Sequence, residues 1–304
     1  MNKMPYNLIE MDYDEILVKL KNTEYLPSYD FLIALEKIIL NEDLPVLVHE
    51  LAVFSGLALR FVYNFENPLI YEDIPYFALE LKKYLGFELH TYSVDFLNQL
   101  EPPFIIAPQN ILVIGDIGDT LTCEHEFERF EQKVFEVSPS SSIVKLQTRK
   151  IDRAELYDKS KFTEVIYEVH KNYYEKDVKN SYYIGKHAFK EFLNDLGDLS
   201  KEREDRLSLV LKKTIRDQLS SLYGLRVYLL GYYHFLGNLD QKVLFEGLNA
   251  LGDAIMFYRE FERVTKEALI KGQFTTEVRR RGVNSMKKFI ASFEHFLYSL
   301  EKLI

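Results

Sequence analysis

The chain has 304 residues, of which 47% are hydrophobic and 28% are charged. It contains only 13 glycines and 9 prolines, so a disordered, collagen-like or low-complexity protein is excluded, and its length is sufficient for a large buried core. The formal net charge of −9 disfavours nonspecific binding to nucleic acid and to anionic membranes. We therefore expect neither nucleic acid nor a membrane as a partner.

The single cysteine, Cys123, cannot form an internal disulfide, which is typical of proteins in a reducing compartment. The first twenty residues lack the apolar core of a signal peptide, because they carry Glu10, Asp12, Asp14 and Glu15. The longest apolar stretch, residues 227–236, is shorter than the about 20 residues that span a bilayer. These features predict a cytoplasmic protein.

The chain changes character near residue 155. Glycine and proline punctuate the first part, and no proline follows Pro139. From Phe162 onward, apolar residues recur at three- and four-residue spacing, which is typical of amphipathic helices. We therefore predict an α+β domain over residues 1–155 and an all-helical bundle domain over residues 156–304.

In the first part, a helix is predicted over residues 29–40, with Ser28 at its N-cap position. A second helix is predicted over residues 74–85, where Gly86 ends it as residue C′. Apolar and alternating segments predict strands over 57–63, 87–92, 104–107, 111–114, 133–137 and 143–148. Pro108 and residues 138–141 are predicted to form turns.

In the second part, the apolar periodicity predicts helices over 162–177, 183–195, 199–223, 225–236, 243–270 and from 276 to the last residue. Amphipathic helices of this kind are stable only when their apolar faces pack on one another. A helical bundle is therefore the predicted arrangement.

Three segments of the first part carry motifs, in the order Pro27–Leu35 (PSYDFLIAL), Ser55–Phe61 (SGLALRF) and Asn110–Asp116 (NILVIGD). In this order they resemble the papain-like domains of the peptidase C39-like group, in particular the butirosin biosynthesis protein H-like family. Those domains carry a nucleophile at the start of their first long helix, a Gly-x-x-Phe-Arg-like segment, and a histidine that opens a strand ending in Gly-Tyr-Asp. Residues 183–189 (YIGKHAF) are similar to a helix start found further along in such proteins.

The resemblance implies a papain-like α+β domain whose catalytic residues have been replaced. The family nucleophile is a cysteine, and the matching position here is Ser28; the position of the histidine is taken by Gln109 or Asn110, depending on the register. Neither amide accepts a proton near pH 7, and a serine without a base is a poor nucleophile. The resemblance therefore implies a pseudoenzyme without a cofactor. It would bind an acyl, aminoacyl or peptide-type ligand in the cleft between its two parts, in a bacterial biosynthetic pathway.

The predicted ligand-binding residues are Ser28, Ser55, Arg60, Asn110, Asp116 and Tyr232. Tyr232 belongs to a tyrosine-rich stretch that either lines a pocket or fills the core. The others have structural alternatives as well, because Ser28 suits an N-cap, Ser55 a turn, Arg60 an ion pair and Asp116 a glycine-containing turn.

The densest group of potential metal ligands is Cys123-Glu124-His125-Glu126. A zinc site needs three or four nitrogen or sulfur ligands, and this group offers one thiol and one imidazole. An acidic loop or helix start explains the group better, so we predict no metal site.

Two other functions remain open on the sequence alone. The first is an active acyltransferase or hydrolase with Ser28 as nucleophile and His49 or His90 as its base. The second is a helical scaffold or regulatory protein that acts through the basic segment Arg279–Arg281, near Lys271, Lys287 and Lys288. That segment would suit a phosphate or an acidic partner such as a carrier protein.

Overall fold

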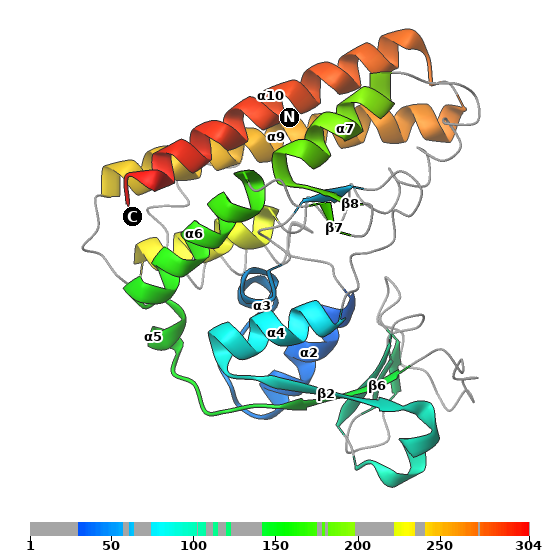
Figure 1. Cartoon of the computed structure of the whole chain (residues 1–304), viewed down its shortest axis with the longest axis vertical. Helices are drawn as coiled ribbons and strands as arrows, with labels where there is room; N and C mark the ends of the chain where they lie inside the picture. The colour runs from blue at the N-terminus through cyan, green and yellow to red at the C-terminus, as the bar shows by residue number, and fades with distance from the viewer. Residues whose placement is uncertain are drawn as a thin grey trace.

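The computed structural model describes residues 30–56, 61–63, 74–101, 103–107, 112–114, 120–122, 142–174, 178–179, 182–197, 222–234, 241–272 and 274–303. Helices and two antiparallel sheets make up this part of the chain, so the protein has the mixed α+β fold that the sequence predicts. One end of the molecule holds a sheet with three helices, and long helices form the other end (Figure 1).

The three helices beside the sheet are α2 (Asp30–Asn41), α3 (Val48–Phe54) and α4 (Ile74–Leu85). The first and third confirm the predicted helices. Gly86 ends α4 as predicted, since its φ of 71° is left-handed and its N–H donates to the Lys82 carbonyl at 3.0 Å. Sequence analysis missed α3, because all seven of its residues are buried and no polar face marks it.

The larger sheet has the strand order β2-β6-β3-β4-β5, and all its neighbouring strands are antiparallel. Its strands are β2 (Glu88–Ser93), β3 (Phe104–Ala107), β4 (Leu112–Ile114), β5 (Thr120–Thr122) and β6 (Ser142–Gln147), and the short helix η3 (Val94–Gln99) follows β2. Strands β3 and β4 pair as a hairpin, which confirms the two strands predicted over 104–107 and 111–114; the predicted turn at Pro108 lies outside the described residues. Helix α2 lies against β3, and α4 lies against β2 (Figure 1).

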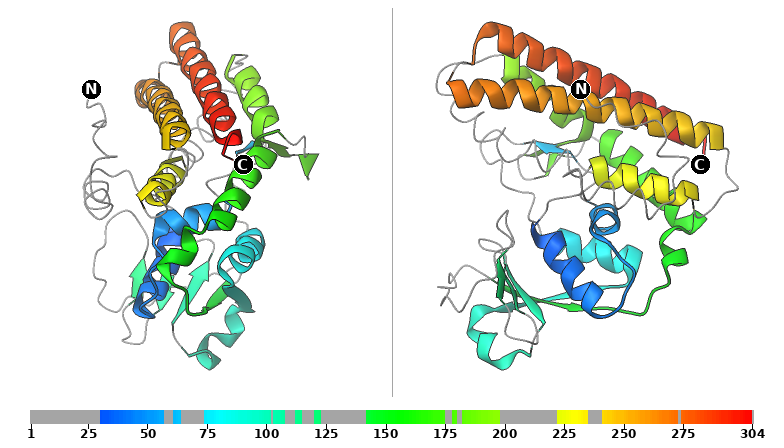
Figure 2. Two further views of the ribbon diagram at one scale, coloured as in Figure 1. Left: turned by 90° about the vertical axis from the view of Figure 1, so that its left-hand side faces the viewer. Right: turned by 180° about the vertical axis from the view of Figure 1, so that it is seen from behind.

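The helical end contains α5 (Arg153–Leu156), α6 (Lys159–Tyr174), α7 (Gly185–Gly197), a helix over 222–234, α9 (Gln241–Lys271) and α10 (Thr276–Glu301). The long helices α9 and α10 run antiparallel and side by side, and α7 lies along α10 (Figure 2). No helix in the described ranges has the length and apolar character needed to cross a membrane.

The second part of the chain is not all-helical, so that prediction was wrong for one segment. Strands β7 (Val178–Lys179) and β8 (Tyr182–Ile184) form a hairpin, and β8 also pairs with β1 (Val62–Tyr63) from the first part. Aromatic and β-branched residues favour strands, and β8 consists of two tyrosines and an isoleucine. Helix α7 therefore begins at Gly185, after the strand.

One continuous core extends through both parts of the chain. Phe54 of α3 packs edge-on against Tyr228 of the 222–234 helix, with ring centroids 5.3 Å apart. Phe61 stacks on Phe189 at 3.8 Å, and the Gly185 N–H donates to the Phe61 carbonyl at 2.8 Å. The two parts thus differ in their elements but bury their apolar side chains together.

Candidate functional site

Most of the predicted site residues lie outside the described residues, namely Ser28, Arg60, Gln109, Asn110 and Asp116. The 123–126 group, for which no metal site is predicted, lies outside them as well. The elements that flank the two matched positions are described. Helix α2 begins at Asp30, just after Ser28, and the β3–β4 hairpin brackets residues 109 and 110. Because α2 lies against β3, the flanking elements of the two positions are neighbours.

Ser55 is described and completely buried, at the C-cap position of α3. Its hydroxyl donates to the Ala52 carbonyl at 3.3 Å, and its N–H donates to the Leu51 carbonyl at 2.8 Å. These bonds satisfy free carbonyl groups at the end of the helix. Ser55 therefore has the turn role, and its ligand contact stays a prediction.

Tyr232 is also described, and only 1% of it is exposed. Its ring stacks on Phe162, with centroids 3.7 Å apart and an angle of 9° between the rings. Stacking of this kind stabilises a core beyond the area that it buries. The ring therefore packs in the core, and a ligand contact of Tyr232 stays a prediction.

The two histidines considered as bases lie on different elements and in different surroundings. His49 is on α3 and 1% exposed, and its Nε2 lies 3.8 Å from Glu50 Oε1. His90 is exposed on β2, at the edge of the sheet, and its Nε2 lies 3.2 Å from Gln147 Oε1. Strand β6 separates β2 from the β3–β4 hairpin.

A buried polar cluster lies where α3 meets the helical part, and sequence analysis did not single it out. We call it the Glu50 cluster; its members are Glu36, His49, Glu50, Arg153 and Tyr157. The Tyr157 hydroxyl donates to Glu50 Oε1 at 2.5 Å, and the Leu47 N–H donates to Glu50 Oε2 at 2.7 Å. Arg153 Nη2 lies 3.9 Å from the same carboxylate.

The local fold explains how these groups come together. Glu50 is the third residue of α3 and reaches back to the N–H of Leu47, which precedes the helix. Glu36 of α2 accepts a hydrogen bond from the Val48 N–H at 2.7 Å. Two carboxylates therefore satisfy the N–H groups of Leu47 and Val48 at the start of α3.

Tyr157 follows α5, and Tyr228 of the 222–234 helix positions its ring. The Tyr228 ring stacks on Tyr157 with centroids 5.4 Å apart. The Tyr228 hydroxyl donates to the Leu156 carbonyl at 3.0 Å. The phenol that reaches Glu50 is thus positioned by a residue from a distant part of the chain.

Burial raises the pKa of Glu50 to about 7, although the hydrogen bonds from Tyr157 and Leu47 and the charge of Arg153 act to lower it. The negative charge of Glu36 adds to the increase. A carboxyl with this pKa can both hold and release a proton at neutral pH. Glu50 and His49 have almost no exposed surface, so no substrate reaches them in this conformation.

The sequence does contain a signal for this cluster. His49 and Glu50 interrupt an otherwise apolar run over residues 46–54. An ionisable pair inside such a run indicates buried charge that needs partners from elsewhere in the fold. Tyr157 is more than a hundred residues away along the chain, so its role was not visible in the sequence.

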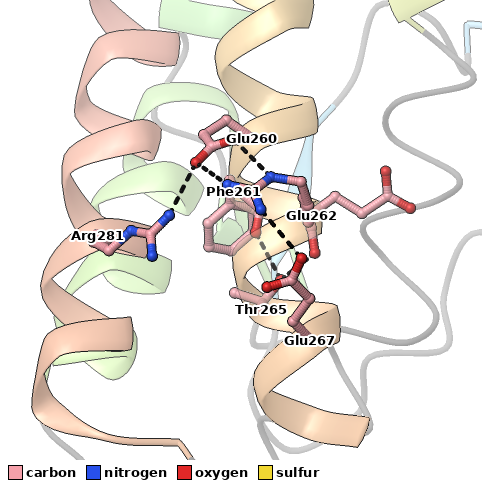
Figure 3. Close-up of polar contacts among 7 residues, drawn as sticks. Glu260, Phe261, Glu262, Thr265, Glu267 and Arg281 are labelled. Carbon is pink, nitrogen blue, oxygen red and sulfur yellow. Dashed lines mark hydrogen bonds and ion pairs between the residues drawn. The ribbon is translucent and has the colours of Figure 1, made fainter. Parts of the chain in front are cut away.

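The basic segment Arg279–Arg281 lies on α10, and two of its arginines are paired with carboxylates. Arg280 pairs with Glu277 at 2.9 Å. Arg281 reaches across to Glu260 of α9 at 3.4 Å, and Glu260 also binds Arg263 at 2.8 Å (Figure 3). These pairs neutralise part of the positive charge of the segment.

Among the residues that the structure describes, no three His, Cys, Asp or Glu side chains gather as a metal site would require. No protein-family model matches the chain, and no curated protein is significantly similar to it.

Proposed function

We propose that the chain is a catalytically inactive papain-like protein that binds an acyl, aminoacyl or peptide-type ligand in a cleft between its two parts. The ordered motifs support the papain-like assignment, and Ser28 with Gln109 or Asn110 stands where such an enzyme has its cysteine and histidine. The observation that carries the proposal is the contact of α2 with β3. Because of this contact, the element that follows Ser28 and the hairpin that brackets residues 109 and 110 are neighbours. A site formed by both positions requires such an arrangement.

The surroundings of the two candidate bases favour an inactive protein. His49 is buried beside Glu50, and His90 lies beside Gln147 at the exposed edge of the sheet. A general base must come within about 3.2 Å of the proton that it removes, directly or through one water. Neither histidine belongs to α2 or to the β3–β4 hairpin.

The variant Ser28→Ala tests this proposal. The substitution removes the predicted N-cap, and this loss should lower the free energy of unfolding by about 1 kcal/mol. Thr275→Ala is a matched control, since the Thr275 side chain caps α10 by accepting from the Val278 N–H at 3.3 Å. Both variants should lose similar stability in urea denaturation.

Binding and turnover are then measured with the same two variants. The probes are an acyl pantetheine, aminoacyl amides and short peptides, with binding followed by thermal shift and hydrolysis by mass spectrometry. We expect at least one probe class to bind wild type and Ser28→Ala equally well, with no hydrolysis by either. Hydrolysis that Ser28→Ala abolishes and Thr275→Ala retains would contradict inactivity, and a panel without any binder would contradict the ligand class.

A further inference from the structure

A short buried hydrogen bond between Tyr157 and Glu50 is one of the contacts that join the two parts of the chain. Tyr157 lies between β6, the last strand of the first part, and α6, the first long helix of the second. Its hydroxyl donates to the buried Glu50 carboxyl at 2.5 Å. The pair thus lies at the point where the chain passes from the sheet to the bundle.

Several titratable or charged groups face the Glu50 carboxyl, from each element packed around it. They are Glu36 of α2, His49 of α3, Arg153 of α5, Tyr157 after α5 and Tyr228 of the 222–234 helix. Arg153 Nη2, at 3.9 Å, is beyond hydrogen-bond distance of the carboxylate, and Glu36 contributes a like charge. Burial disfavours the charged form of Glu50, and this effect outweighs the hydrogen bonds from Tyr157 and Leu47 and the charge of Arg153, all of which favour the carboxylate.

We propose that the Glu50 carboxyl, buried beside Tyr157 at the interface, is a proton-controlled latch between the sheet end and the helical end of the molecule. With the proton on Glu50, the interface of α3 with α5 and the 222–234 helix stays closed. Loss of the proton leaves a buried carboxylate, whose desolvation is unfavourable. Local opening of this interface then admits water to Glu50.

The direction of the pH effect follows from proton binding. In the closed form the pKa of Glu50 is about 7, whereas an exposed glutamate has a value of 4.5. The closed form therefore binds more protons between these values, and rising pH favours the open form. Proton binding and opening are linked, so these two pKa values determine how the equilibrium changes with pH. The ratio of open to closed molecules rises about tenfold from pH 6 to pH 8.

Hydrogen exchange measured by mass spectrometry on the full chain tests the latch. Exchange is recorded at pH 6 and pH 8 and corrected for the intrinsic pH dependence of amide exchange. In the wild type, the opening constant of peptides from α3 and the 222–234 helix should rise about tenfold. Peptides from α9 and α10 serve as the internal reference and should show no such rise. In Glu50→Gln the rise in α3 should disappear.

Two tyrosine variants form a second, independent test. Tyr157→Phe removes the hydrogen bond that lowers the pKa of Glu50, so the rise from pH 6 to pH 8 should become steeper than in the wild type. Tyr228→Phe is the matched control, because its hydroxyl donates to the Leu156 carbonyl and not to Glu50. Its pH dependence should equal that of the wild type.

The latch is overturned if corrected exchange in α3 is the same at both pH values in the wild type. It is also overturned if Glu50→Gln keeps the full rise. If Glu50→Gln does not fold, the two tyrosine variants provide the test. Equal pH profiles for Tyr157→Phe and Tyr228→Phe would contradict the proposal. None of these readouts depends on a ligand, so they are distinct from the test of the proposed function.

Discussion

Gly231 lies directly against the ring of Tyr157, so that a Cβ on residue 231 would stand 2.6 Å from a ring carbon and 2.7 Å from the hydroxyl oxygen. This close approach leaves room for the Tyr157 ring between the 222–234 helix and α3, where it stacks on Tyr228 and binds Glu50. A glycine on one helix thus allows the buried contact between the two ends of the molecule.

The variant Gly231→Ala should therefore destabilise the protein. Alanine is normally the better residue inside a helix by up to about 1 kcal/mol, but overpacking of a filled core costs about 1–3 kcal/mol. We expect a net loss in urea denaturation. Gly282→Ala in α10 is the control, because its Cβ would meet Phe261 at an ordinary 3.5 Å. It should be neutral or stabilising, and equal losses for both variants would contradict the role of Gly231.

The stability of the wild type should fall as the pH rises from 5 to 8. The pKa of Glu50 is raised by burial to about 7 in the folded protein, so the stabilising proton is fully bound below 4.5 and is lost as the pH passes 7. This shift corresponds to at most about 3 kcal/mol in the free energy of unfolding. Denaturation of wild type and Glu50→Gln at pH 5 and pH 8 measures it. The variant should lose less stability over this range, and parallel pH profiles would contradict the prediction.

Tyr232 offers a test of core packing against a polar role. Because its ring stacks on Phe162 and is almost fully buried, Tyr232→Phe should change the free energy of unfolding by less than about 1 kcal/mol. Tyr232→Ala should lower it by about 3–5 kcal/mol through loss of the ring. A large loss in Tyr232→Phe would show that the hydroxyl, and not the ring, stabilises this site.

The ion pairs of the basic segment should contribute little to stability. Arg281 and Glu260 are partly exposed, and exposed pairs are worth about 0–1 kcal/mol. Arg281→Ala should therefore lower the free energy of unfolding by less than about 1 kcal/mol, and less still in 1 M salt. Glu260→Gln should have a larger effect, because it weakens the pairs with both Arg263 and Arg281 (Figure 3). Equal effects would mean that the two arginines do not share this carboxylate.

Sequence patterns predicted the elements that have one buried face. The helices α2, α4, α9 and α10 and the β3–β4 hairpin all lie close to their predicted bounds, because apolar periodicity or turn residues mark them. Helix α3 is buried on every side and carries no such pattern. The helix predicted over 183–195 included the end of β8, because the pairing of β8 with β1 is a long-range contact.

The candidate site shows the same division. His49 and Glu50 are visible as polar residues in an apolar run, but their properties come from partners far away in sequence. The raised pKa of Glu50 results from burial by elements of both parts of the chain, and Tyr157 reaches it only because Gly231 and Tyr228 position the ring. No local pattern encodes these contacts.

Labelling with a fluorophosphonate tests most directly whether catalytic chemistry survives at Ser28. This reagent forms a covalent bond with a serine only when a base activates the hydroxyl. Folded wild-type protein is treated with the reagent, and modified peptides are identified by mass spectrometry, with Ser28→Ala as the blank. We expect no modification of Ser28. Stoichiometric modification of Ser28 in the folded protein, absent after denaturation, would contradict the assignment as an inactive papain-like protein.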